Sequence, residues 1–281
     1  MIKKFILLGD THGANVKPAR QARRMYPDLQ PSEIGLIILG DAGFNCGHPE
    51  DGNWKKLANK IGVQIFCVRG NHDEHPTNLE DIKLVHNNDM NRLVYWQDFE
   101  NTKLVYNDDI NGLVYWQEEY KNIFYLVDGA TYNIDGLNTL VIGGAYSVDK
   151  PYRLENNMFW EPREQISQDE WDIIKYTHFG HHYDLVLTHT CPLSWQPKDL
   201  FLSFIDQSEV DNTMEIWFEE LKNNITFDMW YFGHYHADRL VRPGVQMLYN
   251  IGDPIECAKA RWIDKDPEYL IGWEKDPNYY T

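Results

Sequence analysis

The sequence predicts an α/β fold built around a parallel sheet, and two observations support this prediction. First, three short apolar runs alternate with two stretches of helical character over residues 5–68. This strand–helix–strand–helix–strand order is typical of a parallel sheet with right-handed crossovers. Second, five apolar runs along the chain are each followed by a short polar cluster. Open α/β folds bind ligands where their strands end, so we expect these clusters to meet at one edge of a sheet.

The individual elements follow from periodicity and from helix end signals. In the first part of the chain, strands are predicted at 5–8, 36–39 and 63–68, and helices at 15–25 and 54–61. Further strands are predicted at 123–127, 130–134, 139–142, 184–187 and 229–232. Ser167 and Glu170 form a capping box that begins a helix through residue 176, and a last helix is predicted at 210–221.

A tandem duplication interrupts this alternation. Residues 83–98 and 103–118 match at an offset of twenty, and both contain Lys-Leu-Val, an Asn/Asp-rich middle and Leu-Val-Tyr-Trp-Gln. Each copy is typical of a β-hairpin, and two copies are too few for a solenoid. We therefore expect a hairpin-like insertion near 81–120. Its aromatic residues either pack onto the sheet or form a surface for a protein partner or a substrate cap: Tyr95, Trp96, Tyr115 and Trp116.

The composition limits the classes of partner. The net charge of −17, from 43 acidic and 26 basic residues, disfavours nucleic acid. A small phosphorylated substrate or a phosphoprotein remains compatible, because two divalent ions would bring about +4 to a local site. Arg20, Arg23 and Arg24 have helical spacing and are interpreted as a solvated helix face rather than a phosphate-binding patch.

The cysteines and the apolar runs predict a cytoplasmic protein. The four cysteines show no paired spacing, and the first apolar run is too short for a signal peptide or a membrane span: Cys46, Cys67, Cys191 and Cys257. The polar clusters extend from residue 9 to residue 236 and have to meet, which favours one domain over 1–281. An extension near 255–281 is expected to pack over that domain.

The five polar clusters contain residue types that bind metals. They read Gly9-Asp10-Thr11-His12-Gly13, Gly40-Asp41-Ala42-Gly43, Gly70-Asn71-His72-Asp73, Thr188-His189-Thr190 and Gly233-His234-Tyr235-His236. Together they supply two leading carboxylates, an amide oxygen and several imidazoles. This set suits a pair of borderline divalent metals better than calcium, which prefers oxygen ligands, or structural zinc, which favours cysteine.

In order and content, these clusters resemble those of the calcineurin-like metallophosphoesterases over about residues 3–252. The resemblance implies a four-layer α/β/β/α sandwich of two central mixed sheets flanked by helices. It also implies hydrolysis of a phosphoester by a hydroxide that bridges two divalent metals, with Mn²⁺ expected and Fe or Zn also suited to the ligands. The implied metal ligands are Asp10, His12 and His236 for one ion, Asp41 as a bridge, and Asn71, His189 and His234 for the other.

The same resemblance suggests roles around the metals. His72 would protonate the leaving group or stabilise its charge, and Asp41 would organise both ions. Asp73 would either orient His72 or hydrogen-bond the loop backbone. Independently of the resemblance, Arg153 is predicted in a loop after the strand that ends at Gly143-Gly144, where it would either hold phosphate or form an ion pair with Asp149. Asp73, Arg153 and Tyr235 are therefore the predicted substrate contacts. His178, His181 and His182 match no family motif and are interpreted as surface residues.

Three departures favour the phosphodiesterase-like branch over phosphomonoesterases of the Ser/Thr protein phosphatase type. The second cluster lacks the Asp-Arg-Gly of those phosphatases, the third ends in Asp73 rather than Glu, and the last carries a paired Gly-His-x-His. The competing interpretation is a metal-binding scaffold without catalysis. It is disfavoured because His72 is present with the whole ligand set.

Overall fold

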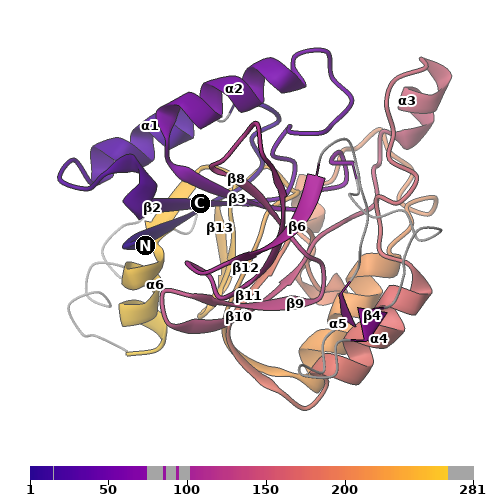
Figure 1. Ribbon diagram of the computed structural model, residues 1–281. Helices are drawn as coiled ribbons and strands as arrows, with labels where there is room; N and C mark the ends of the chain where they lie inside the picture. The colour runs from indigo at the N-terminus through magenta and orange to yellow at the C-terminus, as the bar shows by residue number, and fades with distance from the viewer. Residues whose placement is uncertain (15, 75–84, 87–92, 95–101, 265–281) are drawn as a thin grey trace.

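The fold consists of two central mixed sheets with helices on their outer faces (Figure 1). The computed structural model describes residues 1–14, 16–74, 85–86, 93–94 and 102–264. In spatial order, the first sheet contains β15 (Ile251–Pro254), β1 (Lys4–Leu8), β2 (Ile34–Leu39), β3 (Gln64–Val68), β8 (Ile123–Leu126), β7 (Gly112–Gln117) and β6 (Thr102–Asn107). The second contains β13 (Arg239–Arg242), β14 (Val245–Met247), β12 (Thr226–Phe232), β11 (His182–Thr188), β10 (Leu137–Ile142) and β9 (Ala130–Ile134).

The central strands of both sheets run in parallel, as the strand–helix alternation predicts. In the first sheet β1, β2, β3 and β8 are parallel neighbours, and in the second β10, β11, β12 and β14 are. The antiparallel strands lie towards the edges. The carboxyl ends of the central strands are therefore available to carry a common site.

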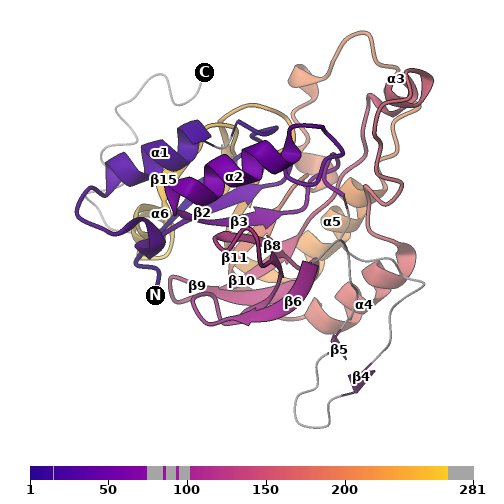
Figure 2. The ribbon, with the colours of Figure 1, turned by 45° about the horizontal axis from the view of Figure 1, so that its top comes forward.

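Helices cover the two outer faces of this sandwich (Figure 2). The first sheet is covered by α1 (Val16–Met25) and α2 (Asp51–Ile61), and the second by α4 (Gln168–His178) and α5 (Thr213–Asn224). The shorter helix α3 (Lys150–Glu155) projects from the body in both views. Three 3₁₀ turns lie at Pro31–Glu33, Leu193–Trp195 and Lys198–Leu200.

The core has three apolar layers, which explain the run-like patterns of the strands. Leu7 and Ile37 point between the sheets, where they meet Leu187 of the second sheet. Ile6 and Ile38 point the other way, under α1 and α2. All six residues of β2 are buried, because a strand covered on both faces needs apolar side chains on both. A corresponding layer lies beneath α4 and α5.

Both copies of the duplication contain antiparallel strand pairs. The second copy is the hairpin of β6 and β7, which extends the first sheet beyond β8. Its Tyr115 is buried, and its Trp116 packs against the core between the sheets. In the first copy, β4 (Val85–His86) pairs with β5 (Leu93–Val94). Its two aromatic residues, Tyr95 and Trp96, lie outside the described residues.

The last described segment is integrated with the first strand. β15 pairs antiparallel with β1, and α6 (Ile255–Trp262) follows it. Ile255 and Ala258 are buried in the core between the sheets. The remainder of the predicted extension, from residue 265, lies outside the described residues. No helix in the described part of the chain has the length and apolar character needed to cross a membrane.

Three sequence expectations need correction. The helix predicted at 210–221 begins at Thr213 and ends at Asn224. Arg153 lies in the short helix α3 rather than in a loop, with Pro151 in its first turn. His178, expected at the surface, is buried at the end of α4, where its ring nitrogens lie 2.6 Å from the Tyr183 hydroxyl and 2.9 Å from the Gly129 carbonyl oxygen. His181 and His182 are exposed, as expected.

Candidate metal centre

The five polar clusters all follow the carboxyl ends of central strands. The first three follow β1, β2 and β3 of the first sheet, and the last two follow β11 and β12 of the second. Polar contacts join residues from different clusters and from both sheets, including His12 with His236 and Asn71 with His189. The site is therefore built where the two sheets meet at one end of the sandwich.

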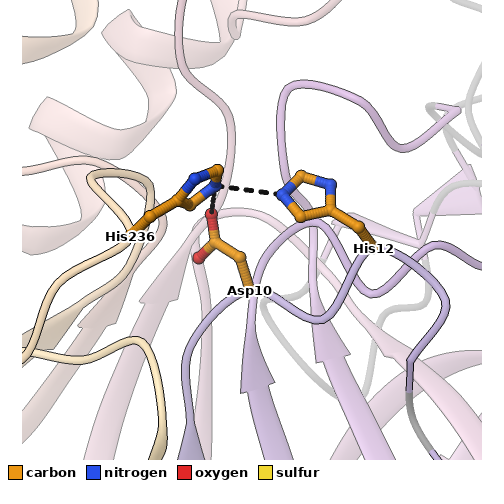
Figure 3. A group of neighbouring side chains, drawn as sticks. All are labelled: Asp10, His12 and His236. Carbon is orange, nitrogen blue, oxygen red and sulfur yellow. Dashed lines mark hydrogen bonds and ion pairs between the residues drawn. The ribbon is translucent and has the colours of Figure 1, made fainter.

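One group of potential ligands consists of Asp10, His12 and His236 (Figure 3). The Nε2 atom of His236 lies 3.2 Å from Oδ2 of Asp10 and 3.0 Å from Nε2 of His12. Although His236 is so close, Oδ2 of Asp10 is buried and has no well-oriented hydrogen-bond donor among the described residues. Two imidazole nitrogens and a buried carboxylate oxygen thus converge on one point, which fits a cation better than hydrogen bonding among themselves.

A second group surrounds Asn71. Its Oδ1 atom lies 2.8 Å from Nε2 of His189 and 3.1 Å from Nδ1 of His234. The Nδ1 atom of His189 lies 2.7 Å from the carbonyl oxygen of Leu39, so in the neutral ring Nδ1 donates and Nε2 carries the lone pair. Ser147 accepts from Nδ2 of Asn71 at 2.8 Å, which aims the amide oxygen at the histidines. Two acceptor atoms only 2.8 Å apart repel each other, and a cation bound by both would remove this repulsion.

Asp41 lies between these groups. Its Oδ2 is 3.7 Å from Nε2 of His189, and Asp10, Asp41 and His189 each have a ligand atom within 4.8 Å of the others. The backbone N–H of His72 donates to Oδ1 of Asp41 at 2.9 Å. The arrangement therefore places one buried carboxylate where it can face two ions.

The electrostatics favour ligand-competent protonation states at Asp41 and His234, whereas the carboxylate of Asp10 raises the pKa of His236. Burial raises the pKa of Asp41, but the neighbouring rings of His189 and His72 outweigh it and lower the net pKa. Burial and the neighbouring His189 lower the pKa of His234 to about 3. An ionised carboxylate and a neutral imidazole are the forms that bind metals.

The backbone of the site is unusually strained. Residues with positive φ include His12 (44°), Asp41 (47°), His234 (68°) and His236 (51°). They are four of the eight non-glycine residues with positive φ in the described part of the chain. Such conformations are uncommon for non-glycine residues, although Asn, Asp and His adopt them more often than the others, and strained backbone clusters at functional sites.

Gly40 shows how tightly the site is built. A Cβ atom at this position would lie 2.0 Å from Nδ1 of His189, and its φ is +97°. The glycine thus allows the end of β2 to pass directly against the ring of His189. No other residue type combines that backbone conformation with that contact.

His72 lies beside the candidate ligands rather than within their groups. Its side chain is 21% exposed, and Nε2 is 3.9 Å from Oδ2 of Asp41. Burial lowers the pKa of His72, Asp41 opposes this effect, and the charge of Arg153 lowers it further. This position is compatible with contact to a bound substrate.

The three predicted substrate contacts have different surroundings. Oδ2 of Asp73 accepts the Gly70 N–H at 2.8 Å, and burial raises the pKa of this carboxyl to about 7. The hydroxyl of Tyr235 lies 3.1 Å from Oγ1 of Thr190, in the interior. Both polar groups have internal partners, and the roles of Asp73 and Tyr235 as substrate contacts stay predictions.

Arg153 forms an ion pair with Asp149, which was the second of its two predicted roles. Its Nε donates to Oδ2 of Asp149 at 2.6 Å, and Nη1 donates to the carbonyl oxygen of Phe159 at 3.1 Å. The role of this residue as a phosphate contact stays a prediction.

Sequence reasoning missed two supporting residues. Ser147 orients Asn71, and a lone serine after a strand gives no signal of such a role. Glu215 accepts a hydrogen bond from Oγ1 of Thr190 at 2.7 Å, beside His189 and Tyr235. A signal for Glu215 was present, because it is an acidic residue on the buried face of α5 between Met214 and Phe218.

Comparison with known proteins agrees with this geometry. The family model of the calcineurin-like phosphoesterases matches residues 3–238, which include all five polar clusters. A search of the curated proteins found no match.

Proposed function

Because the chain belongs to the calcineurin-like phosphoesterases, a family of phosphoester-hydrolysing enzymes, we propose that it is a dinuclear-metal phosphodiesterase of a small phosphorylated substrate. The observation that carries this proposal is the convergence of metal-type atoms from both sheets. The pair Asn71 Oδ1 and His189 Nε2, 2.8 Å apart, and the pair His12 Nε2 and His236 Nε2, 3.0 Å apart, flank two buried carboxylates.

The proposed ligands divide between two ions. Asp10, His12 and His236 hold the first, and Asn71, His189 and His234 hold the second, with Asp41 shared. Mn²⁺ is the proposed metal, and Fe or Zn also fits this nitrogen and oxygen set. When bound, two such ions supply the positive charge that activates water and neutralises phosphate oxygens.

The chain's own residues would prepare the site for that chemistry. The Leu39 carbonyl fixes the tautomer of His189, and Ser147 fixes the amide of Asn71. These hydrogen bonds present lone pairs to the centre without rearrangement on binding. His72 is the proposed proton donor to the leaving oxygen, because it is partly exposed beside Asp41 and is outside the ligand groups.

The preference for diesters rests on sequence features. The second cluster offers no arginine to hold the extra charge of a monoester, and Arg153 is paired with Asp149. The four cysteines of the chain form no disulfide in the described structure, which supports the proposal of a cytoplasmic location. The acidic composition supports a small substrate over a nucleic acid.

The first test distinguishes the proposed phosphodiesterase activity from its alternatives. The protein is stripped with a chelator, reloaded with Mn²⁺ and assayed on a nitrophenyl diester and the matching monoester. Faster hydrolysis of the diester supports the proposal. A strong monoester preference would replace it with a phosphatase that uses Arg153, and turnover of neither by the loaded protein would leave the scaffold interpretation.

The second test separates metal binding from proton transfer. Asp41→Asn is expected to lose bound metal and activity together, because it removes the shared carboxylate. His72→Ala is expected to keep its metal content and lose turnover, least with a good leaving group such as nitrophenolate. Loss of metal in His72→Ala, measured by elemental analysis, would contradict the proposed role of His72.

A further inference from the structure

A second group of metal-type side chains lies at the opposite ends of β11 and β12. His182 opens β11, Asp184 follows two residues later, and Asp228 is the third residue of β12. The candidate ligands His189 and His234 follow the other ends of the same strands. At about 3.3 Å per residue, the two groups are roughly 15–25 Å apart. The group at the opposite ends therefore belongs to a different site.

The spacing of the three side chains suits one ion. Nε2 of His182 lies 3.8 Å from Oδ1 of Asp184 and 3.4 Å from Oδ2 of Asp228. One ligand atom from each residue lies within 4.8 Å of the other two. Tetrahedral ligands about 2.1 Å from a metal are about 3.4 Å from one another. Small side-chain shifts would therefore allow all three atoms to bind the same cation.

Neighbouring groups already orient two of the three ligands. Nδ1 of His182 lies 3.0 Å from the hydroxyl of Thr226, so Nε2 is the nitrogen that faces the carboxylates. The backbone N–H of Asn138 donates to Oδ2 of Asp184 at 2.7 Å, which leaves Oδ1 on the side of His182. Hydrogen bonds of this kind fix the rings and carboxylates of metal ligands.

Among the described residues, the basic side chain paired with the carboxylates of both Asp184 and Asp228 is His182. His182 lies opposite Thr226, and Leu185 lies opposite Met229, so Asp184 and Asp228 stand at the same level of two adjacent strands. Like charges placed opposite each other destabilise a sheet. Within the described ranges, neither carboxylate forms an ion pair with a lysine or arginine. A divalent cation would remove this repulsion.

The site is also accessible. The side chains of His182, Asp184 and Asp228 are 50%, 33% and 37% exposed. An ion can therefore enter from solvent, and water can complete its coordination. Burial of the ligands is not needed for a site that only cross-links two strands.

We propose that His182, Asp184 and Asp228 bind a borderline divalent cation, with Zn²⁺ as the best fit, at a structural site separate from the catalytic centre. The bound ion would hold the amino-terminal ends of β11 and β12 together. A mixed set of one imidazole and two carboxylates fits zinc or cobalt better than calcium or magnesium, which prefer oxygen ligands.

The test is equilibrium dialysis of the full chain against Zn²⁺, with bound zinc counted by elemental analysis. His182→Ala and Asp228→Asn are each expected to bind one zinc ion fewer per chain than the wild type. His181→Ala is the matched control, because it removes an exposed neighbouring histidine outside the group, and it is expected to bind as the wild type does. Phosphodiester hydrolysis is expected to be unchanged in all three variants.

Equal zinc contents in the wild type and His182→Ala would overturn the proposal. They would show that His182 is only a hydrogen-bonding or cationic neighbour of the two aspartates. As a second readout, zinc is expected to raise the melting temperature of the wild type more than that of the double variant Asp184→Asn/Asp228→Asn, which keeps the side-chain shapes. An equal zinc-dependent increase in the two proteins would also contradict the site.

Discussion

Gly40→Ala is expected to displace His189 from the proposed metal site, although no proposed ligand is itself replaced. The new Cβ would lie 2.0 Å from Nδ1 of His189, whereas ordinary contact begins at 3.4 Å. The ring of His189 would have to retreat by about 1.4 Å, since 3.4 − 2.0 = 1.4. Metal–nitrogen bonds tolerate only about 0.2 Å, so this movement would take His189 out of coordination.

A control variant separates the expected loss of unfolding free energy in Gly40→Ala into two parts. Gly40 and Gly136 both have positive φ, +97° and +81°, but a Cβ at Gly136 would meet nothing within 4 Å. Gly136→Ala is therefore expected to lose only the backbone term, about 1–2 kcal/mol of unfolding free energy, and to keep its activity. Gly40→Ala adds an overpacking term of about 1–3 kcal/mol.

The assay combines three measurements at a temperature where both variants are folded. Urea unfolding gives the stability, elemental analysis gives the bound Mn²⁺, and a nitrophenyl diester gives the turnover. We expect Gly40→Ala to lose at least about 10–100-fold in activity, the range seen when the support of a ligand is removed. If Gly40→Ala matched Gly136→Ala in both metal content and turnover, the assignment of His189 as a ligand would be refuted.

Three further predictions concern stability. Burial raises the pKa of Glu215 to about 7, so the folded state holds this proton more tightly than the unfolded state does, and the wild type should lose stability as the pH rises through about 5–7. Glu215→Gln, which keeps an acceptor for Thr190, should reduce this pH dependence of the unfolding free energy, as measured by urea titrations at several pH values. Burial lowers the pKa of His178, so the contribution of the neutral ring to the unfolding free energy should be fully present above about pH 6.5 and should decrease below it. His178→Gln should therefore lose less stability in acid, by the same measurement. The buried guanidinium of Arg69 donates to Asp128 at 2.7 Å, so Arg69→Met should lose about 3–5 kcal/mol of unfolding free energy by removing the charged partner of a largely buried carboxylate. A loss below about 1 kcal/mol would contradict this.

Much of the central architecture could be predicted from the sequence because the strands of this fold are short and buried. A run such as residues 36–39 is apolar on both faces, and a polar cluster begins where it ends. The positions of Asp10, Asp41 and Asn71 at strand ends follow from local pattern alone. The partners that orient them do not, because the contacts of Ser147 and Glu215 depend on chain segments distant in sequence.

The error at His178 has a local physical cause. The predicted helix stopped at residue 176, whereas α4 continues to His178. Trp171, Ile174 and His178 follow a helical spacing, so the last turn carries the histidine to the buried face. Similarly, the lysine–proline pair before Arg153 was not interpreted as a helix start, although proline is common in a first helical turn.

The left-handed backbone at four of the candidate site residues has a consequence for how the sequence can change. Glycine at His12, Asp41, His234 or His236 would relieve an unfavourable conformation, and at Asp41 it would also remove a buried charge. In the metal-free protein, selection for thermal resistance alone would therefore favour the loss of these residues, whereas selection for activity would retain them. A laboratory evolution experiment screened by heating in the presence of a chelator should accumulate substitutions at these positions, whereas one screened by hydrolysis should leave them unchanged.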